Sequence, residues 1–313
     1  MNSKKEFKSN EKIYDFIAVW AGPAGLTAGI YGGRYKLNCL IIGKIPGGYA
    51  GTAHQICNFP SYEKISGMEL MLKMMKQVKD YGYEIKQESV EEIDKKNDLF
   101  EVKTAKNKYL CKKIILATGT ERIKLGLEKE KEFLGKGVSY CVTCDAGFYK
   151  DKTVGIVGGG NDAIVDASLI SKYAKKVYLI YRGEKFTKVE HVWLEDLEKN
   201  KNIEILFNTT VKKLIGDKKL EKIEIDVYGK RRILDVDGVF IQAGSEPNTK
   251  LAEKLGLKLE KGEIVVDKKQ KTNVDGIFAA GDATIVPFKQ IITACSGGAI
   301  AVHTIYKELI GEK

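Results

Sequence analysis

Two cysteines separated by two residues, Cys141 and Cys144, are the side chains in this sequence best suited to chemistry, and Asp145 follows them directly. A thiolate is the form of cysteine that attacks a disulfide. A neighbouring carboxylate can carry the proton that each half of a thiol–disulfide exchange requires. The grouping therefore predicts a redox-active pair, and a structural disulfide or an inert buried pair is the alternative.

The remaining cysteines and the histidines decide whether the pair binds zinc instead. The other cysteines are Cys39, Cys57, Cys111 and Cys295, and the histidines are His54, His191 and His303. A structural zinc site needs about four ligands, which only residues far away in the sequence could add. We therefore predict redox chemistry and no metal site.

Two segments repeat one pattern of strand, glycine-rich turn, helix and strand. The first pattern has a strand at 16–19, a turn at 21–25, a helix at about 26–35 and a strand at 37–42, and the second has the same elements at 154–157, 158–163, 164–174 and 177–181. Such a turn aims the free N–H groups of a helix N-terminus at a pyrophosphate. The sequence thus predicts an α/β fold with two nucleotide-binding domains.

Two further apolar runs, residues 114–119 and 276–282, fit the same scheme as buried strands that end in small turns. Asp282 lies just past the end of the second run. Its carboxylate is placed to accept a hydrogen bond from a sugar or ribitol hydroxyl. A role as a helix N-cap is a compatible alternative.

Trp20 stands where the first glycine of the first turn is expected. That glycine ordinarily makes the tight turn at the end of the strand. We expect tryptophan to fit only with a negative φ and with its indole pointing away from the pyrophosphate. A tolerated substitution is favoured, because Gly22 and Gly25 remain; a shifted or weakened nucleotide site is the alternative.

The 313 residues are 43% hydrophobic and 30% charged, which is ordinary for a globular chain of about two domains. The net charge of +10 suits acidic partners, but no nucleic-acid-binding motif accompanies the scattered lysines. The apolar stretch at 16–30 is interrupted by Gly22 and Pro23, which argues against a signal peptide or a membrane span. We expect a cytoplasmic protein without nucleic-acid or membrane partners.

The order and spacing of nine short motifs resemble a known family. The motifs are Gly22-Pro23-Ala24-Gly25, Gly47-Gly48, Asn58-Phe59-Pro60, Ala117-Thr118-Gly119, Cys141-Val142-Thr143-Cys144-Asp145, Gly158 to Ala163, Gly244 to Asn248, Gly281-Asp282 and Gln290. From about residue 14 to the C-terminus the chain resembles the low-molecular-weight thioredoxin reductases, within the pyridine nucleotide-disulfide oxidoreductases. The cysteine pair just before the second glycine motif is highly specific for that group.

The resemblance implies two Rossmann-like (three-layer ββα) domains, with the second inserted into the first. An FAD domain would comprise residues 1–122 and 248–313, and the smaller domain, 123–247, would carry the cysteines and bind NADPH. Family members are usually homodimers whose smaller domain rotates, so that the cysteines alternate between flavin and thioredoxin. Carried over, Cys144 is the flavin-side sulfur, Cys141 the thiol that attacks the partner's disulfide, and Asp145 their acid–base group.

The resemblance also implies a set of cofactor contacts. The matching flavin positions are Gly22, Pro23, Ala24, Gly25, Gly47, Gly48, Asn58, Ala117, Thr118, Gly119, Gly281, Asp282, Lys289, Gln290 and Ile291. On the dinucleotide side the matching positions are Gly158, Gly160 and Arg182.

Near the flavin positions, two residues depart from the family pattern. Tyr49 replaces the usual glutamine after the paired glycines, and Cys57 replaces a usual acidic residue. Cys57 is either a third redox thiol or, the favoured interpretation, a small buried hydrophobe.

The most informative departure follows the second strand of the second pattern. NADPH-using members have His-Arg-Arg-x-x-x-Arg there, and the arginines clamp the 2′-phosphate. In this chain Arg182 remains, whereas Gly183 and Thr187 replace the other two arginines. Glu184 would repel a phosphate or bind a ribose hydroxyl of NADH, and Lys185 or Lys188 could compensate as point charges. Members that lack the clamp draw electrons from ferredoxin or another low-potential donor.

These observations together predict a thioredoxin reductase-like flavoprotein whose electron donor is not NADPH but a protein of the ferredoxin type. The alternatives are an NAD(P)H-dependent oxidoreductase acting on another disulfide and a flavin-free relative without enzymatic activity. Trp20 is the main support for the flavin-free alternative, and the intact Cys141, Cys144 and Asp145 argue against it.

Overall fold

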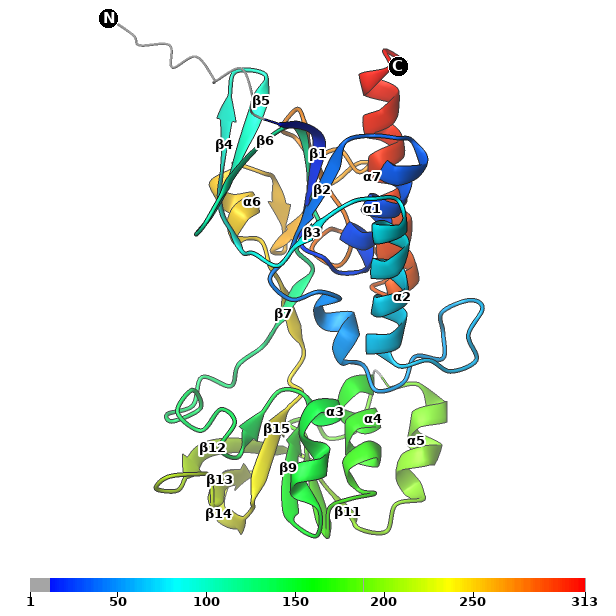
Figure 1. Ribbon diagram of the computed structural model, residues 1–313. Helices are drawn as coiled ribbons and strands as arrows, with labels where there is room; N and C mark the ends of the chain where they lie inside the picture. Colours follow the sequence, from blue (N-terminus) through cyan, green and yellow to red (C-terminus); the bar gives the residue numbers. More distant parts are fainter. Residues whose placement is uncertain (1–11, 188, 313) are drawn as a thin grey trace, which may run out of the picture. The chain divides into compact units, whose positions relative to one another are not determined.

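The computed structural model describes residues 12–187 and 189–312. They form two compact units: the first contains the described residues up to Glu121 and from Pro247 onward, and the second spans Arg122–Glu246. Each unit is α/β with a largely or wholly parallel sheet, as the two glycine patterns predict (Figure 1). The chain leaves and re-enters the first unit through β7 (Thr120–Arg122) and β16 (Ser245–Pro247), which pair with each other.

The first unit is built on a seven-stranded sheet with the order β3-β2-β1-β6-β5-β4, to which β19 adds beside β6. Its strands are β1 (Ile13–Val19), β2 (Cys39–Ile42), β3 (Ile85–Lys86), β4 (Val90–Lys96), β5 (Leu99–Thr104), β6 (Lys108–Leu116) and β19 (Ile277–Ala279), with a small pair β17 (Leu259–Glu260) and β18 (Glu263–Ile264). Its helices are α1 (Pro23–Arg34), η1 (Gly48–Thr52), α2 (Gly67–Asp80), α6 (Lys250–Lys254) and α7 (Ile291–Leu309). Strands β1, β2, β3, β6 and β19 are parallel where they pair, whereas β4 and β5 pair antiparallel.

Strand β1 is buried on both faces of this sheet, which explains its continuous apolar sequence. Phe16 and Ala18 pack in a cluster with α1, α2 and α7, which lie together on one face (Figure 1). Ile17 and Val19 pack in a second cluster on the other face. The alternation follows from the two-residue period of a strand. Packing on both faces thus fixes β1 in an inner position of the sheet, between β2 and β6, and the first glycine turn begins where β1 ends.

The second unit has a parallel sheet with the order β11-β10-β9-β15-β8, and a separate antiparallel sheet with the order β12-β13-β14. Its strands are β8 (Val138–Ser139), β9 (Thr153–Val157), β10 (Lys176–Ile180), β11 (Ile203–Leu206), β12 (Thr209–Ile215), β13 (Lys222–Val227), β14 (Lys230–Asp235) and β15 (Gly238–Ile241). Its helices are α3 (Val142–Asp145), η2 (Ala146–Tyr149), α4 (Asn161–Ile170) and α5 (His191–Glu198). One apolar cluster joins the parallel sheet to the helices and another joins it to the antiparallel sheet, which makes three layers.

Both predicted glycine patterns are present, but their helices begin earlier than expected. Helix α1 starts at Pro23 rather than at residue 26, because proline at the first helical position already has the required φ. Helix α4 starts at Asn161, within the motif, and ends at Ile170 rather than at 174. The last residues of each motif therefore form the first turn of the helix, and Gly22 and Gly160 are the N-caps. No helix within residues 12–187 and 189–312 is long and apolar enough to cross a membrane.

Candidate active site and nucleotide cradles

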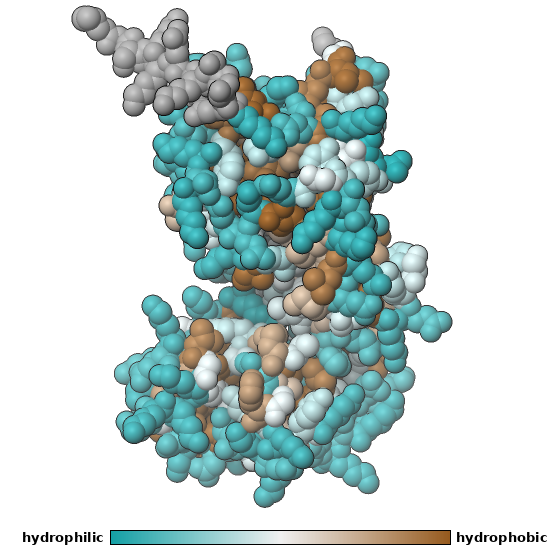
Figure 2. Space-filling view, in the orientation of Figure 1, coloured by the Kyte–Doolittle hydropathy of each residue, from teal (hydrophilic) through white to brown (hydrophobic). Residues whose placement is uncertain are grey.

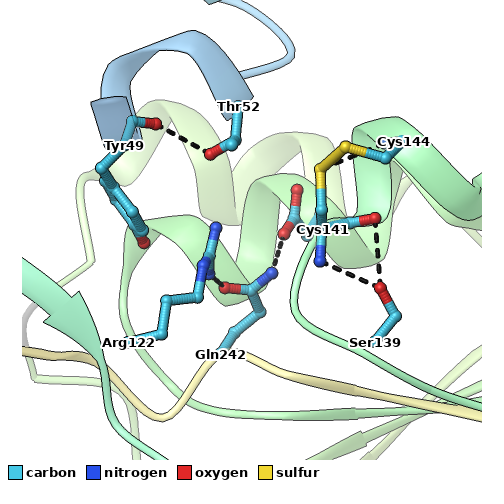
Figure 3. The surroundings of a disulfide bond; sticks show 8 residues. Tyr49, Thr52, Arg122, Ser139, Cys141, Cys144 and Gln242 are labelled. Carbon is cyan, nitrogen blue, oxygen red and sulfur yellow. Dashed lines mark hydrogen bonds between the residues drawn. A yellow bond between two sulfur atoms is a disulfide. The ribbon is translucent and has the colours of Figure 1, made fainter. Parts of the chain in front are cut away.

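Cys141 and Cys144 form a disulfide in the second unit, with Cα atoms 5.4 Å apart (Figure 3). Cys141 is the N-cap of α3, and its Sγ accepts a hydrogen bond of 3.2 Å from the backbone N–H of Cys144. The buried Ser139 holds the same residue from the other side. The Cys141 N–H donates to Ser139 Oγ at 3.0 Å, and that hydroxyl donates to the Cys141 carbonyl at 3.4 Å.

Asp145 ends α3, one residue after the disulfide, and its N–H donates to the Cys141 carbonyl at 3.2 Å. Its side chain is half-buried. The Asp145 charge also helps to raise the pKa of Tyr149, although burial of that phenol is the larger cause. A half-buried carboxylate directly after the pair has the chemistry of a proton carrier.

A polar chain that the sequence did not reveal runs beside this site in the second unit. Arg122 donates to the Gln242 side-chain oxygen, and the Gln242 amide donates to Asp166 on α4 (Figure 3 shows the first two residues). Burial raises the pKa of Asp166 to about 7; the nearby Asp162 adds to the rise and Arg122 opposes it. No sequence pattern predicts this series of hydrogen bonds, because its three residues come from separate segments of the sequence. Ser139 could have been proposed from the sequence, although only weakly, because it lies two residues before Cys141.

The first glycine turn offers an open anion site at the N-terminus of α1. Gly22 is the N-cap with φ −83° and ψ −173°, and no side chain caps the helix there. A Cβ on Gly22 would meet no atom within 4 Å, so a phosphate has room at this end of the helix. A Cβ on Gly25 would lie only 3.1 Å from the Trp20 carbonyl carbon, so glycine is required for α1 to reach the strand end. The turn at Gly47 and Gly48 packs against the start of α1, since a Cβ on Gly48 would lie 3.3 Å from Gly22 Cα.

Trp20 adopts φ +86°, so the expectation of a negative φ is wrong. Trp20 keeps the left-handed conformation that a glycine would adopt, because the Trp20 N–H donates to Ile42 O at 2.6 Å and α1 packs against the Trp20 carbonyl. The indole packs against the apolar cluster that contains Val19. The adjacent strand end is thus intact despite the substitution.

Two predicted flavin positions that are far apart in sequence meet at the start of α7. Gln290 caps this helix in a capping box with Thr293, and its Oε1 accepts a hydrogen bond of 3.0 Å from Asn58 Nδ2. Nearby in sequence, Cys57 is exposed and its thiol accepts a hydrogen bond from Gln55 at 3.1 Å. The interpretation of Cys57 as a buried hydrophobe is therefore wrong.

Asp282 lies in a turn after β19, and burial raises the pKa of its carboxyl, while Lys289 opposes part of the rise. Its Oδ1 is buried and has no hydrogen-bond partner within residues 12–187 and 189–312. It is not a helix N-cap, since the next helix, α7, begins at Ile291. Lys289 itself pairs with Glu263. An unpartnered buried acceptor requires a donor, and a ligand hydroxyl would supply one.

The remaining predicted flavin positions lie in the same unit. Gly281 has φ +80°, and a Cβ there would lie 3.2 Å from the Cβ of Ala24. Thr118 follows Ala117 at the end of β6, donates to the Asn248 carbonyl at 2.7 Å, and precedes Gly119, which has φ +59°. The open helix end and the unpartnered Asp282 carboxylate together fit a dinucleotide that carries a polyhydroxyl chain.

The second glycine turn, in the second unit, has the same backbone at its helix start. Gly160 caps α4 with φ −100° and ψ −179°, and Gly158 N–H donates to Ile180 O at 3.0 Å. Arg182, Glu184 and Lys185 are exposed, whereas Lys188 lies outside the described residues. No cluster of metal ligands is present in the part of the chain that the structure describes.

Comparison with known proteins connects this architecture to one family. The pyridine nucleotide-disulphide oxidoreductase model matches residues 14–298. The thioredoxin reductase of Mycoplasma genitalium is 41% identical over 96% of this chain and 96% of its own. The Lactococcus lactis thioredoxin reductase structure superimposes with a TM-score of 0.90 at 30% identity, covering 95% of this chain and 99% of that one. A ferredoxin-flavin thioredoxin reductase from Clostridium acetobutylicum is 32% identical with a TM-score of 0.52, covering 96% and 99%.

Proposed function

The chain belongs to the pyridine nucleotide-disulphide oxidoreductases and has the fold of their low-molecular-weight thioredoxin reductases, and we propose that it reduces thioredoxin through Cys141 and Cys144. It is an oxidoreductase that acts on a sulfur group. In this proposal residues 1–122 and 248–313 bind FAD, residues 123–247 present the cysteine pair, and the enzyme is a homodimer. The observation that carries the proposal is the Cys141–Cys144 disulfide held at the start of α3.

The family implies FAD, and the first unit has the features that such a cofactor requires. The pyrophosphate would bind at the N-terminus of α1, which contains Gly22, Pro23, Ala24 and Gly25. The Asp282 carboxylate would accept a hydrogen bond from a hydroxyl of the ribityl chain. The Asn58–Gln290 pair and the Gly47-Gly48 turn lie in the same unit. When bound, the flavin supplies the two electrons that reduce the disulfide.

The cysteines take different roles in the exchange with thioredoxin. The hydrogen bond from the Cys144 N–H to Cys141 Sγ stabilises a thiolate on Cys141 once the disulfide is reduced. That thiolate attacks one sulfur of the thioredoxin disulfide, so that a Cys141–thioredoxin bond forms while the thioredoxin disulfide breaks. Cys144, the flavin-side sulfur, then attacks Cys141 and releases thioredoxin with both of its thiols reduced.

Each reduced thioredoxin needs two protons, and in this proposal Asp145 carries them one at a time. Asp145 is half-buried and directly follows Cys144 in the sequence. Its carboxyl protonates the leaving thiolate and then takes up another proton from solvent.

The surface beside the pair suits a protein substrate. Phe148, three residues after Asp145, has 73% of its surface exposed, so its ring is free to contact a partner protein. Hydrophilic residues predominate on the face shown in Figure 2, and the chain carries a net charge of +10. An acidic partner with an apolar rim around its disulfide would match both features.

The donor in this proposal is a low-potential protein of the ferredoxin type rather than NADPH. The support is the loss of two clamp arginines at Gly183 and Thr187, and the exposed Glu184 in the same loop. The relative from Clostridium acetobutylicum named ferredoxin-flavin thioredoxin reductase covers 96% of this chain.

An anaerobic titration of the flavin absorption band tests both parts. We expect dithionite to bleach the band, oxidised thioredoxin to restore it, and NADPH to leave it unchanged. Stoichiometric bleaching by NADPH would overturn the donor assignment alone. Failure of oxidised thioredoxin to restore the dithionite-reduced band would overturn the thioredoxin reductase function.

A further inference from the structure

The ring of Tyr181, the residue after β10, lies on the backbone of the second glycine turn. A Cβ added to Gly159 would overlap the ring, and one added to Gly183 would lie 2.6 Å from its Cε1. Both glycines thus leave space that the tyrosine fills. Gly183 also occupies one of the lost arginine positions, so the ring and a side chain at 183 exclude each other.

Aromatic neighbours hold the ring in this place. Tyr181 stacks on Phe186 with centroids 5.5 Å apart and planes 20° apart, and Phe207 meets it edge-on at 6.5 Å. Phe186 and Phe207 also contact each other at 5.0 Å. Ring contacts of this kind stabilise the cluster beyond what the burial of the rings alone contributes.

Backbone hydrogen bonds fix the same segment to the β11–β12 turn. The Tyr181 N–H donates to Leu206 O at 2.9 Å, and the Thr209 N–H donates to Tyr181 O at 3.0 Å. The Asn208 N–H donates to Gly183 O at 3.0 Å. Moving the ring away therefore requires a side-chain rotation against its stacked partners, because the backbone is held on both sides.

The helix start that would face a pyrophosphate is also acidic. Asp162 lies in the first turn of α4. Asn161, the first residue of α4, exchanges two hydrogen bonds with Glu190: its Nδ2 donates to the carboxylate at 3.0 Å, and its Oδ1 accepts from the Glu190 N–H at 2.9 Å. Carboxylates at a helix N-terminus take the favourable place of an anionic ligand and repel it.

We propose that the Tyr181 ring, which fills the space beside Gly159 and Gly183, excludes NADH and NADPH from this enzyme. The ring and the carboxylates at the start of α4 do not fit such a cofactor, although Gly158 and Gly160 keep the motif and a Cβ on Gly160 would meet no atom within 4 Å. The inference rests on the proposed function only in its choice of cofactor class, since it concerns binding and not thioredoxin reduction.

A matched pair of variants isolates the ring. Asp162→Asn/Tyr181→Ala and Asp162→Asn/Tyr181→Phe both relieve the charge at α4, but only the first removes the ring. Titration calorimetry with NADH, which needs no arginine clamp, is expected to give a dissociation constant at least about tenfold lower for the alanine variant than for the phenylalanine variant. Tyr181→Ala alone provides a second comparison with the unaltered protein.

Equal NADH affinity in the matched pair, with flavin content and melting temperature retained, would overturn the role of Tyr181. So would saturable NADH binding by the unaltered protein as tight as that of the alanine variant. Dithionite-driven reduction of thioredoxin, measured on the same samples, reports separately on the proposed function, so loss of that reaction in the unaltered protein is a distinct failure.

Discussion

The side-chain amide of Asn58 donates to Gln290 Oε1 at 3.0 Å, which joins two residues 232 positions apart in the sequence. The same Gln290 side chain accepts from the backbone of Thr293 and so caps α7, the longest helix of the first unit. One side chain therefore ties the loop around residue 58 to the start of a helix that packs against α1. The proposed flavin contacts at Asn58 and Gln290 depend on each other for position.

Replacing Gln290 tests this coupling. Gln290→Ala removes the cap and the partner of Asn58, and we expect it to lower the free energy of unfolding by about 1 kcal/mol, the usual cost of a lost cap. In a double-mutant cycle with Asn58→Ala, the two changes should cost less together than the sum of their separate costs. Chemical denaturation of the apoprotein measures these values. Simple additivity would show that the hydrogen bond has no energetic role.

The two cysteines are predicted to differ in reactivity. Cys144→Ser leaves Cys141 as the thiolate stabilised by the backbone N–H of residue 144, whereas Cys141→Ser leaves a thiol without that hydrogen bond. We expect Cys144→Ser to displace thionitrobenzoate from an activated single-cysteine thioredoxin at least about tenfold faster at neutral pH, since the thiolate is the nucleophile. The released chromophore gives the rate. The opposite order would exchange the assigned roles.

Ser139 is predicted to act on this chemistry by positioning Cys141. Ser139→Ala removes the acceptor of the partly buried Cys141 N–H, and the loss of such a hydrogen bond costs about 1 kcal/mol. We expect slower exchange with thioredoxin and an altered pH profile for alkylation of reduced Cys141, with Ser139→Thr restoring part of both. An unchanged alkylation profile together with a lower melting temperature would make the role of Ser139 purely structural.

Asp166 predicts a dependence of stability on pH. Burial raises the pKa of its carboxyl from 3.8 to about 7 in the folded protein. A raised folded-state pKa contributes stability below the unfolded value, and this contribution is lost as the pH rises through about 7. Asp166→Asn keeps an acceptor for Gln242 but cannot ionise. We therefore expect the melting temperature to fall between about pH 5 and pH 8 more steeply in the unaltered protein than in the variant. Parallel curves of melting temperature against pH for the two proteins would contradict the raised pKa of Asp166.

The sequence was sufficient for the features that depend on local spacing. Two glycine turns between apolar strands predicted both parallel sheets, and Cys141 and Cys144 predicted the pair that forms a disulfide. The conformation at Trp20 could not be predicted, because the Ile42 carbonyl and α1 determine it rather than the residue type. The place of the Tyr181 ring depends on Phe207, 26 positions away, and such contacts leave no periodic signal.

Trp20 provides the most direct test of strain beside the proposed flavin site. At φ +86° a side chain with a Cβ is strained, and such a conformation costs about 1–3 kcal/mol. Trp20→Ala removes the indole but keeps the Cβ, whereas Trp20→Gly removes both. In an ordinary backbone conformation the alanine variant would be the more stable, because glycine gains more entropy on unfolding. Here we expect the glycine variant to be the more stable by about 1 kcal/mol in chemical denaturation, since relief of strain exceeds that entropy. Greater stability of the alanine variant would mean that the turn relaxes to a negative φ once the indole is gone, and that packing of the indole, rather than the hydrogen bond to Ile42, imposes the left-handed turn.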